Sequence, residues 1–134
     1  MSTIVVKTSR VRVSYIAAAL VTIAIGLLVH WNGAALGPVA RDVLGDALWA
    51  AMIVWWMGAL APGVRLVVRC MSAYVVCVVV EVSQLYHTTA LDALRATSAG
   101  HLVLGSGFDV RDLYAYAVGV VGAVVLQRAH RRFT

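Results

Sequence analysis

Charged residues are unusually few in this sequence. Only 13% of its 134 residues are charged, whereas 62% are hydrophobic. A soluble domain of this length carries about a quarter charged residues, so this composition leaves too little polar surface to cover a soluble fold. The composition therefore excludes an ordinary soluble domain and predicts a single transmembrane domain over residues 1–134.

Cysteine and proline are rarer still, with two residues of each. Cys70 and Cys77 are seven residues apart on one predicted helix, which is too far for a bond between them. They are expected to be small packing residues, and a disulfide scaffold is excluded. Pro38 and Pro62 each stand next to a glycine, and these pairs mark breaks between apolar runs.

The sequence also lacks the patterns of several functional classes. The net charge is +5, but the basic residues lie beside apolar runs and form no stripe with aromatic residues, so no nucleic-acid partner is expected. His87 and His101 have no ligand spacing to each other, and no metal or cofactor is expected. Ser83 has no readable Asp–His arrangement, and no catalytic residue is assigned.

Long apolar runs are what the sequence does contain. They predict an all-α membrane bundle of four transmembrane helices, over residues 13–31, 44–61, 66–86 and 112–128. Tyr15 is expected to anchor the first helix at the interface, and Arg69 to snorkel from the third. Gly119 and Gly122 are expected to allow close packing of the fourth helix.

A long loop separates the third and fourth predicted helices. Thr89 and Asp92 are spaced as a weak capping box for a short helix ending near Ala96. The apolar piece at residues 101–105 is too short to cross a bilayer. It either re-enters the membrane or stays in the loop, and the sequence leaves this open.

The charges divide between the two sides of the predicted bundle. Because basic residues favour the cytoplasmic side, both termini are predicted to be cytoplasmic. The inner side would then hold Lys7, Arg10, Arg12, Arg65, Arg69, Arg128, Arg131 and Arg132, and the outer side Arg41, Arg95 and Arg111. All carboxylates would lie at the outer side: Asp42, Asp46, Glu81, Asp92, Asp109 and Asp112.

A candidate polar site follows from this division. The start of the second helix, the end of the third and the start of the fourth meet at the outer side, so Asp46, Glu81 and Asp112 can converge. Gln84 shares a helix face with Glu81, and Arg95 is available from the loop. A charge buried within a span usually has a partner or a function.

Two interpretations of this cluster compete. In the structural one, Arg95 and Arg111 pair with Glu81 and the aspartates and fix the loop onto the bundle. In the functional one, the clustered carboxylates handle protons or bind a cation or a polar head group. Asp46 is expected in the first turn of its helix, where capping is the alternative to a site role.

Four ordered motifs resemble DUF family 2809, a family of small bacterial integral membrane proteins of unknown function. They are Gly45-Asp46-Ala47-Leu48-Trp49-Ala50, Glu81-x-x-Gln84-Leu85-Tyr86, Leu91-Asp92-x-x-Arg95, and Leu104-Gly105-x-Gly107-Phe108-x-x-x-Asp112-x-x-Ala115-Tyr116-x-x-Gly119. The resemblance implies a multi-pass protein of the bacterial cytoplasmic membrane. It adds Trp49, Tyr86, Asp92 and Tyr116 as supporting site residues, and the acidic cluster adds Asp109.

The second half also resembles the VanZ-like proteins, which are linked to glycopeptide resistance. The shared features are Glu81-x-x-Gln84, the following Arg95, and Asp112 before a glycine-bearing last helix. Tyr116 stands where the VanZ pattern has asparagine. This resemblance points to the same polar residues and supplies no reaction.

The leading functional hypothesis is an outward-facing site for the polar part of a lipid or cell-envelope precursor. Glu81 would be its central group, Gln84 and Arg95 would orient or bind the ligand, and Asp46 and Asp112 would complete the ring. A proton- or ion-coupled transporter and a non-catalytic structural or assembly protein are the alternatives. The expected partners are membrane lipids, a lipid-linked ligand and a second copy of the chain.

Overall fold

The computed structural model describes residues 2–105 and 107–133, and the side chains of residues 8–105 and 107–130. The described chain consists of helices without a strand, which confirms the predicted all-α class. In chain order they are α1 (Ser2–Asn32), the 3-10 helix η1 (Gly33–Leu36), α2 (Pro38–Leu60), α3 (Leu66–Ser83), α4 (Thr89–Arg95), α5 (Ser98–Leu104) and α6 (Val110–Phe133).

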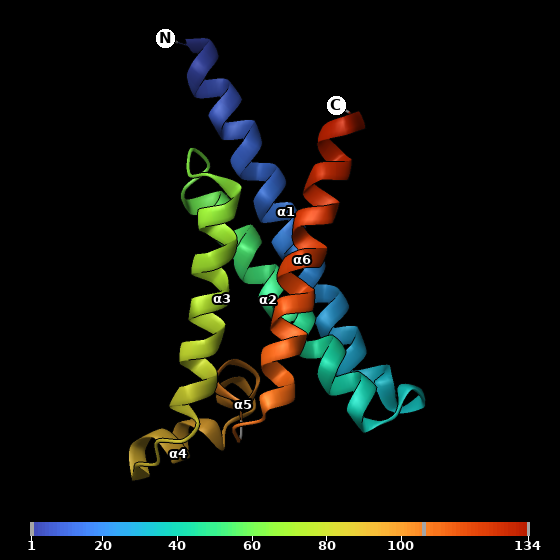
Figure 1. Ribbon diagram of the computed structural model, residues 1–134, viewed down its shortest axis with the longest axis vertical. Helices are drawn as coiled ribbons and strands as arrows, with labels where there is room; N and C mark the ends of the chain where they lie inside the picture. The colour runs from blue at the N-terminus through green and yellow to red at the C-terminus, as the bar shows by residue number, and fades with distance from the viewer. Residues whose placement is uncertain (1, 106, 134) are drawn as a thin grey trace.

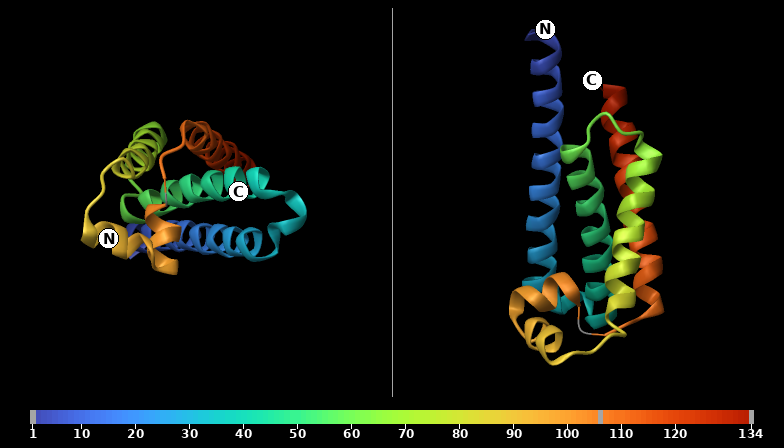
Figure 2. Two further views of the ribbon diagram at one scale, coloured as in Figure 1. Left: turned by 90° about the horizontal axis from the view of Figure 1, so that it is seen from below. Right: turned by 90° about the vertical axis from the view of Figure 1, so that its left-hand side faces the viewer.

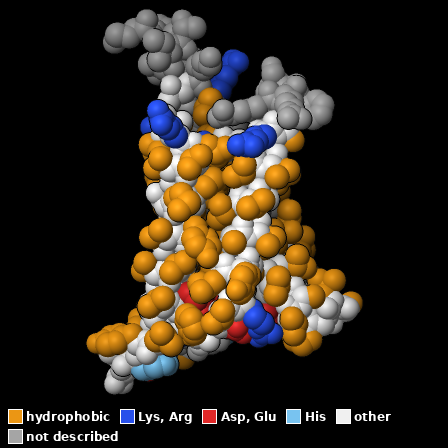
Figure 3. Space-filling model, viewed as in Figure 1, with side chains coloured by type: hydrophobic (Ala, Val, Ile, Leu, Met, Phe, Trp, Pro, Cys, Tyr) orange, Lys and Arg blue, Asp and Glu red, His pale blue; other side chains and the backbone are white. Residues whose placement is uncertain are grey.

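Four of these helices, α1, α2, α3 and α6, are long and apolar enough to cross a membrane. Their outward faces are covered with hydrophobic side chains, as Figure 3 shows for one side of the bundle. In water such a surface would be strongly unfavourable, whereas hydrocarbon covers it at no cost. The protein is therefore a multi-pass membrane protein.

Helix α2 is the centre of the bundle. It packs against α1 on one side and against α3 and α6 on the other (Figure 2). The core between the helices is made largely of small side chains, including Ala50, Ala73, Cys77 and Ala123. Small residues let helix backbones approach closely, which is the main source of attraction between helices in a bilayer. Cys77 and Cys70 are buried and unbridged, in agreement with their predicted packing role.

One glycine sets the distance between α2 and α6. A Cβ atom on Gly119 would collide with the backbone carbonyl of Ala47, whereas a Cβ atom on Gly122 would meet nothing within 4 Å. The sequence assigned close packing to both glycines. Only Gly119 has this role, because it alone faces α2.

The long helices begin and end at other residues than predicted. Helix α2 begins at Pro38, after Gly37 with φ of 77°, because proline suits the first helical turn and glycine adopts the left-handed backbone that precedes it. Asp46 therefore lies about two turns inside α2. The predicted capping role of Asp46 is wrong, since the N-cap residue directly precedes the helix and is Gly37 here. Helix α3 ends earlier than expected, at Ser83.

Two residues predicted at the lipid interface lie inside the bundle instead. Arg69 is 3% exposed, and its guanidinium carbon lies 4.9 Å from the centre of the Tyr15 ring. The Tyr15 hydroxyl accepts a 2.6 Å hydrogen bond from Gln127 Nε2. Gly58 leaves the space for both side chains, because a Cβ atom there would lie 2.5 Å from Arg69 Nη1. These contacts join α1, α2, α3 and α6.

The two short helices, α4 and α5, lie across the end of the bundle opposite to the termini (Figures 1 and 2). The short helix predicted near Thr89 is confirmed, but its cap is Thr88, whose hydroxyl accepts from the Leu91 N–H at 3.2 Å. Thr97 caps α5 in the same way, accepting from the Gly100 N–H at 3.0 Å. Both caps stabilise helices that are too short to persist alone.

Candidate functional site

The two ends of the bundle differ in charge. The end opposite to the termini, which we call the acidic end, holds the helix ends and connections that carry Asp42, Asp46, Glu81, Asp92, Asp109 and Asp112, together with Arg41, Arg95 and Arg111. Figure 3 shows the carboxylates visible from one side at this end, with basic side chains beside them. The described basic residues of the other end are Arg10, Arg12, Arg65, Arg69 and Arg128, while the predicted Lys7, Arg131 and Arg132 lie outside the described side chains. Which end faces the cytoplasm stays a prediction.

Glu81 is at the centre of the acidic end and is 0% exposed. Its Oε1 accepts a hydrogen bond from the backbone N–H of Asp109 at 2.7 Å. Its Oε2 accepts from Gln84 Nε2 at 3.0 Å and from the Tyr116 hydroxyl at 2.9 Å. The carboxylate thus holds together the end of α3, the segment before α6, and α6 itself. All three donors are neutral, so hydrogen bonds rather than an ion pair hold the Glu81 carboxyl group.

The expected ion pair between Arg95 and Glu81 is not formed. Arg95 Nη1 donates to the Tyr86 carbonyl at 2.9 Å, and Nη2 donates to the Ser83 carbonyl at 2.7 Å. These carbonyls end α3, where a cation is favoured by unpaired acceptors and by the helix dipole. Arg95 therefore fixes α4 to the end of α3. Arg95 does pair with one aspartate, Asp92, at 3.3 Å. The predicted pairing with Glu81 is wrong because the sequence does not show where a helix exposes its carbonyls.

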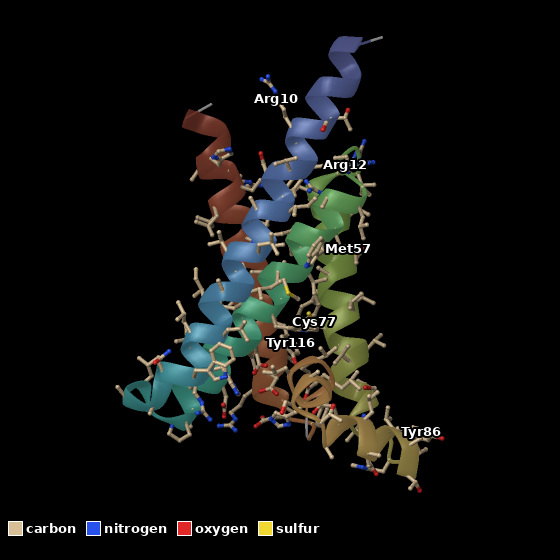
Figure 4. All side chains as sticks on the ribbon, turned by 180° about the vertical axis from the view of Figure 1, so that it is seen from behind. Arg10, Arg12, Met57, Cys77, Tyr86 and Tyr116 are labelled. Carbon is tan, nitrogen blue, oxygen red and sulfur yellow. The ribbon has the colours of Figure 1, made fainter. Side chains whose placement is uncertain are left out.

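Two of the supporting residues predicted from the motifs also belong to this α3–α4 junction. Asp92 lies 3.0 Å from His87 Nδ1 and 3.3 Å from Arg95 Nη1. The Tyr86 side chain is 67% exposed. Figure 4 shows Tyr86 at the periphery of the α3–α4 connection and Tyr116 inside the bundle. The structure does not bring Tyr86 or Asp92 to Glu81.

Arg111 pairs with an aspartate, as the structural interpretation expected. Its Nε donates to Asp109 Oδ2 at 2.8 Å, and its backbone N–H donates to Asp109 Oδ1 at 2.8 Å. Asp109 thus caps α6 with its side chain while its own N–H binds Glu81. The hydrogen bonds from Arg111 hold the pKa of the Asp109 carboxyl below its ordinary value.

This ion pair predicts a pH dependence. A lowered pKa means that the folded state favours the charged carboxylate, so its contribution is fully present above the ordinary pKa of about 3.9. This stabilising contribution is lost as the pH falls through the lowered pKa of the folded state. Asp109→Asn keeps the cap and removes the charge. The thermal unfolding midpoint of this variant in detergent should lie below that of the wild type at neutral pH, and the two midpoints should converge in acid, once the pH is below the lowered pKa of Asp109. A gap that widens in acid would contradict this.

Asp46 of α2 and Asp112 of α6 meet directly. The two carboxyl groups lie close enough to each other and to Glu81 for electrostatic repulsion, and both line one cavity. Like charges at this distance raise each other's energy, so the cluster favours a positively charged partner. The structure therefore brings Asp46, Glu81 and Asp112 together from three helices. Gly119, on the same helix as Asp112, allows the close approach of α2 and α6 that this requires.

A cavity of about 710 Å³ opens beside these carboxyl groups, between α1, α2, α5 and α6. Asp46, Asp112, Gln84 and Tyr116 line it, whereas Glu81 lies behind its wall. The rest of the wall is mainly apolar and includes Ile23, Leu27, Leu48, Trp49, Met52 and Val103. The lining also holds His30, Arg41, Asp42, His101, Asp109 and Arg111. It thus combines polar groups with a mainly apolar wall, and we call the part formed by Asp46, Asp112, Gln84 and Tyr116 its polar end. Trp49, predicted as a supporting residue, belongs to this wall.

Gln84 presents an unsatisfied acceptor at the cavity wall. The residue is 5% exposed, and its Oε1 has no hydrogen-bond partner among the described residues. Gly105, with φ of 67°, lies against this amide, since a Cβ atom there would be 2.5 Å from Gln84 Nε2. A buried carbonyl oxygen without a donor is costly, so such an atom in a cavity wall indicates a place where a ligand or water donates.

Sequence reasoning missed the contribution of α1 to this cavity. Ile23, Gly26, Leu27 and His30 line it, but on an apolar helix such positions look the same as those that face lipid. Only the packing of α1 against α2 distinguishes the two. In the 101–105 segment, whose place the sequence left open, residues 101–104 end α5 and Gly105 is its C-cap. The segment lines the cavity with His101, Leu102, Val103 and Gly105.

The comparison with known families matches this chain to the model described as "Protein of unknown function (DUF2809)", over residues 35–120. The chain belongs to the DUF2809 family. The matched range includes Asp46, Glu81, Gln84, Asp112 and Tyr116, whereas α1, with the cavity-lining His30, lies before it. No solved structure matches the chain. The VanZ-like resemblance of the second half stays a prediction.

Proposed function

We propose that this DUF2809 protein binds the polar part of a lipid or lipid-linked envelope precursor in the cavity at its acidic end. The observation that carries the proposal is the cavity itself, which joins hydrogen-bonding groups of α2, α3 and α6 to an apolar wall from α1 and α2. An amphiphile has the same division. A volume of about 710 Å³ lies within the usual range of small-molecule sites.

The geometry supports different roles for the residues of the site. Asp46, Asp112, Gln84 and Tyr116 line the cavity and would contact the head group. Glu81 lies behind the wall, where it orients Gln84 and Tyr116 through hydrogen bonds. We therefore infer that Glu81 is a positioning residue, whereas the sequence alone favoured it as the central contact.

Two further candidate functions have less support. Proton-coupled transport is supported by the clustering of Asp46, Glu81 and Asp112, but the described core includes Ala50, Val54, Ala73 and Cys77 between the two ends, and these residues do not relay protons. A purely structural role is supported by the bonds of Glu81 and does not account for the unpartnered Oε1 of Gln84.

A cavity-filling substitution tests the proposal. Gly26 lines the cavity, and a Cβ atom there meets nothing within 4 Å. Gly26→Phe should therefore fill the cavity without disturbing the carboxyl groups. Protein purified in mild detergent should lose co-purifying amphiphile by native mass spectrometry, whereas wild type retains it.

Gly122→Phe is the matched control, because Gly122 is equally open and lies outside the cavity lining. This variant should retain the wild-type complement of bound amphiphile. If Gly26→Phe folds normally and carries the same amphiphile as wild type, the cavity is not the binding site and the proposal fails.

A further inference from the structure

We propose that the polar end of the cavity recognises a primary ammonium group, whose N–H donors bind Gln84 Oε1 and the Asp46–Asp112 pair. This inference rests on the proposed function and names the head-group chemistry of the ligand. It is carried by two independent observations, the unpartnered amide oxygen and the excess of negative charge around the cavity.

The orientation of the Gln84 amide follows from Glu81. Glu81 Oε2 already accepts from Tyr116, and a carboxylate offers no donor, so the Gln84 nitrogen must face Glu81 at 3.0 Å. The Gln84 carbonyl oxygen is then turned away from Glu81, in the wall of the cavity and without a donor. An acceptor held in this way requires a ligand that donates a hydrogen bond.

The charges of the cavity wall favour a cationic donor. Arg111 is paired with Asp109, and Arg41 Nε lies 3.9 Å from Asp42. Asp46 and Asp112 form no salt bridge with an arginine or lysine of the described part of the chain, although Arg111 is near enough to Asp112 to attract it. The remaining titratable groups of the wall are His30, His101 and Tyr116. An ammonium group offsets the negative charge of Asp46 and Asp112, whereas a phosphate is repelled by it.

An organic cation suits the site better than a metal ion. Among the described side chains, no three or more His, Cys, Asp or Glu residues are placed to hold a metal. An ammonium group needs acceptors rather than a closed coordination shell. Three N–H donors match the oxygens of Gln84, Asp46 and Asp112, and each such bond is charge-assisted.

Three phospholipids with identical acyl chains test the inference on the full-length protein. Phosphatidylethanolamine carries an ammonium group with N–H donors, phosphatidylcholine carries the same charge without donors, and phosphatidylglycerol is anionic with hydroxyl donors. Binding is measured by native mass spectrometry and by the shift in thermal unfolding. We expect phosphatidylethanolamine to bind about tenfold more tightly than either other lipid, because a tenfold gain in affinity corresponds to about one additional charge-assisted hydrogen bond.

Asp46→Asn should abolish this preference, because it keeps the shape of the site and removes its charge. Asp92→Asn is the matched control, since Asp92 lies in the α3–α4 junction outside the cavity lining, and the preference should persist. The thermal unfolding of each variant without added lipid shows whether it is folded.

The outcomes separate the two proposals. Equal binding of the three lipids, lost in Gly26→Phe, would overturn the ammonium inference and leave the cavity proposal standing. The same holds if phosphatidylcholine or phosphatidylglycerol binds most tightly. If none of the lipids binds the wild type, and Gly26→Phe has no effect on co-purifying amphiphile, both proposals are overturned.

Discussion

Glu81→Leu should unfold at a markedly lower temperature than wild type. The substitution leaves three buried donors without their acceptor, namely the Asp109 N–H, Gln84 Nε2 and the Tyr116 hydroxyl. A buried polar group that loses its partner costs about 1–3 kcal/mol, and the removal of a buried charge offsets part of the sum. We expect a loss of about 3–5 kcal/mol in the free energy of unfolding, measured by thermal or denaturant unfolding in detergent micelles.

Two milder variants serve as controls for this prediction. Glu81→Gln keeps one acceptor oxygen and should cost about 1–2 kcal/mol, because its amide nitrogen faces a donor. Tyr116→Phe removes a single hydrogen bond and should cost about 1 kcal/mol. If Glu81→Leu unfolds at the wild-type temperature, the hydrogen bonds around Glu81 do not hold the acidic end together.

The Glu81→Gln protein also distinguishes a site from a structural clamp. If it remains folded at moderate temperature and loses the amphiphile that wild type retains, Glu81 positions the residues of a binding site. If it is unfolded, and wild type itself carries no specific amphiphile, the acidic cluster serves only to join the helices. The comparison requires both stability and bound ligand to be measured on the same preparation.

Gly119→Ala should be the most damaging exchange of a glycine in the membrane-spanning helices. The added methyl group would collide with the carbonyl of Ala47, which is backbone and cannot turn aside. The α2 and α6 helices must then separate, and overpacking of this kind costs about 1–3 kcal/mol. Because Asp46 and Asp112 lie on these two helices, the two carboxyl groups should also move apart.

Gly122→Ala is the control on the same helix. A Cβ atom there meets nothing within 4 Å, and a surface substitution of this kind should change the stability by less than about 0.5 kcal/mol. Unfolding curves of both variants in the same detergent provide the comparison. Equal stability of the Gly119→Ala and Gly122→Ala proteins would show that the two helices do not touch at Gly119.

The distribution of residue types determined the fold class and the position of the acidic residues along the helices. Apolar runs of this length have one stable arrangement in a bilayer, which is the helix, because every backbone group must be hydrogen-bonded within its own segment. The positions of Asp46, Glu81 and Asp112 near one end of successive spans then follow from the alternating direction of the helices. The ordered motifs predicted the DUF2809 family, and the family match over residues 35–120 confirms this prediction.

The details of the helix ends were less accessible to sequence reasoning. Pro38 was taken as a break before α2, but it is the first residue of that helix. This difference moves Asp46 from a capping position into the bundle. A proline stops a helix that precedes it and equally starts one that follows, and the surrounding residues do not distinguish the two cases.

Only the tertiary structure decided which polar residues meet. Arg95 binds the carbonyls of Ser83 and Tyr86 rather than Glu81, and Arg69 lies over Tyr15 rather than at the interface. Such pairings depend on the rotation and separation of helices, which are set by small contacts such as that of Gly119 with Ala47. These contacts leave no periodic pattern in the sequence. The amino-acid sequence thus determined that this protein crosses a membrane and carries its carboxylates at one end, while helix packing decided that Glu81 lies behind a cavity and that Asp46, Asp112 and Gln84 face into it.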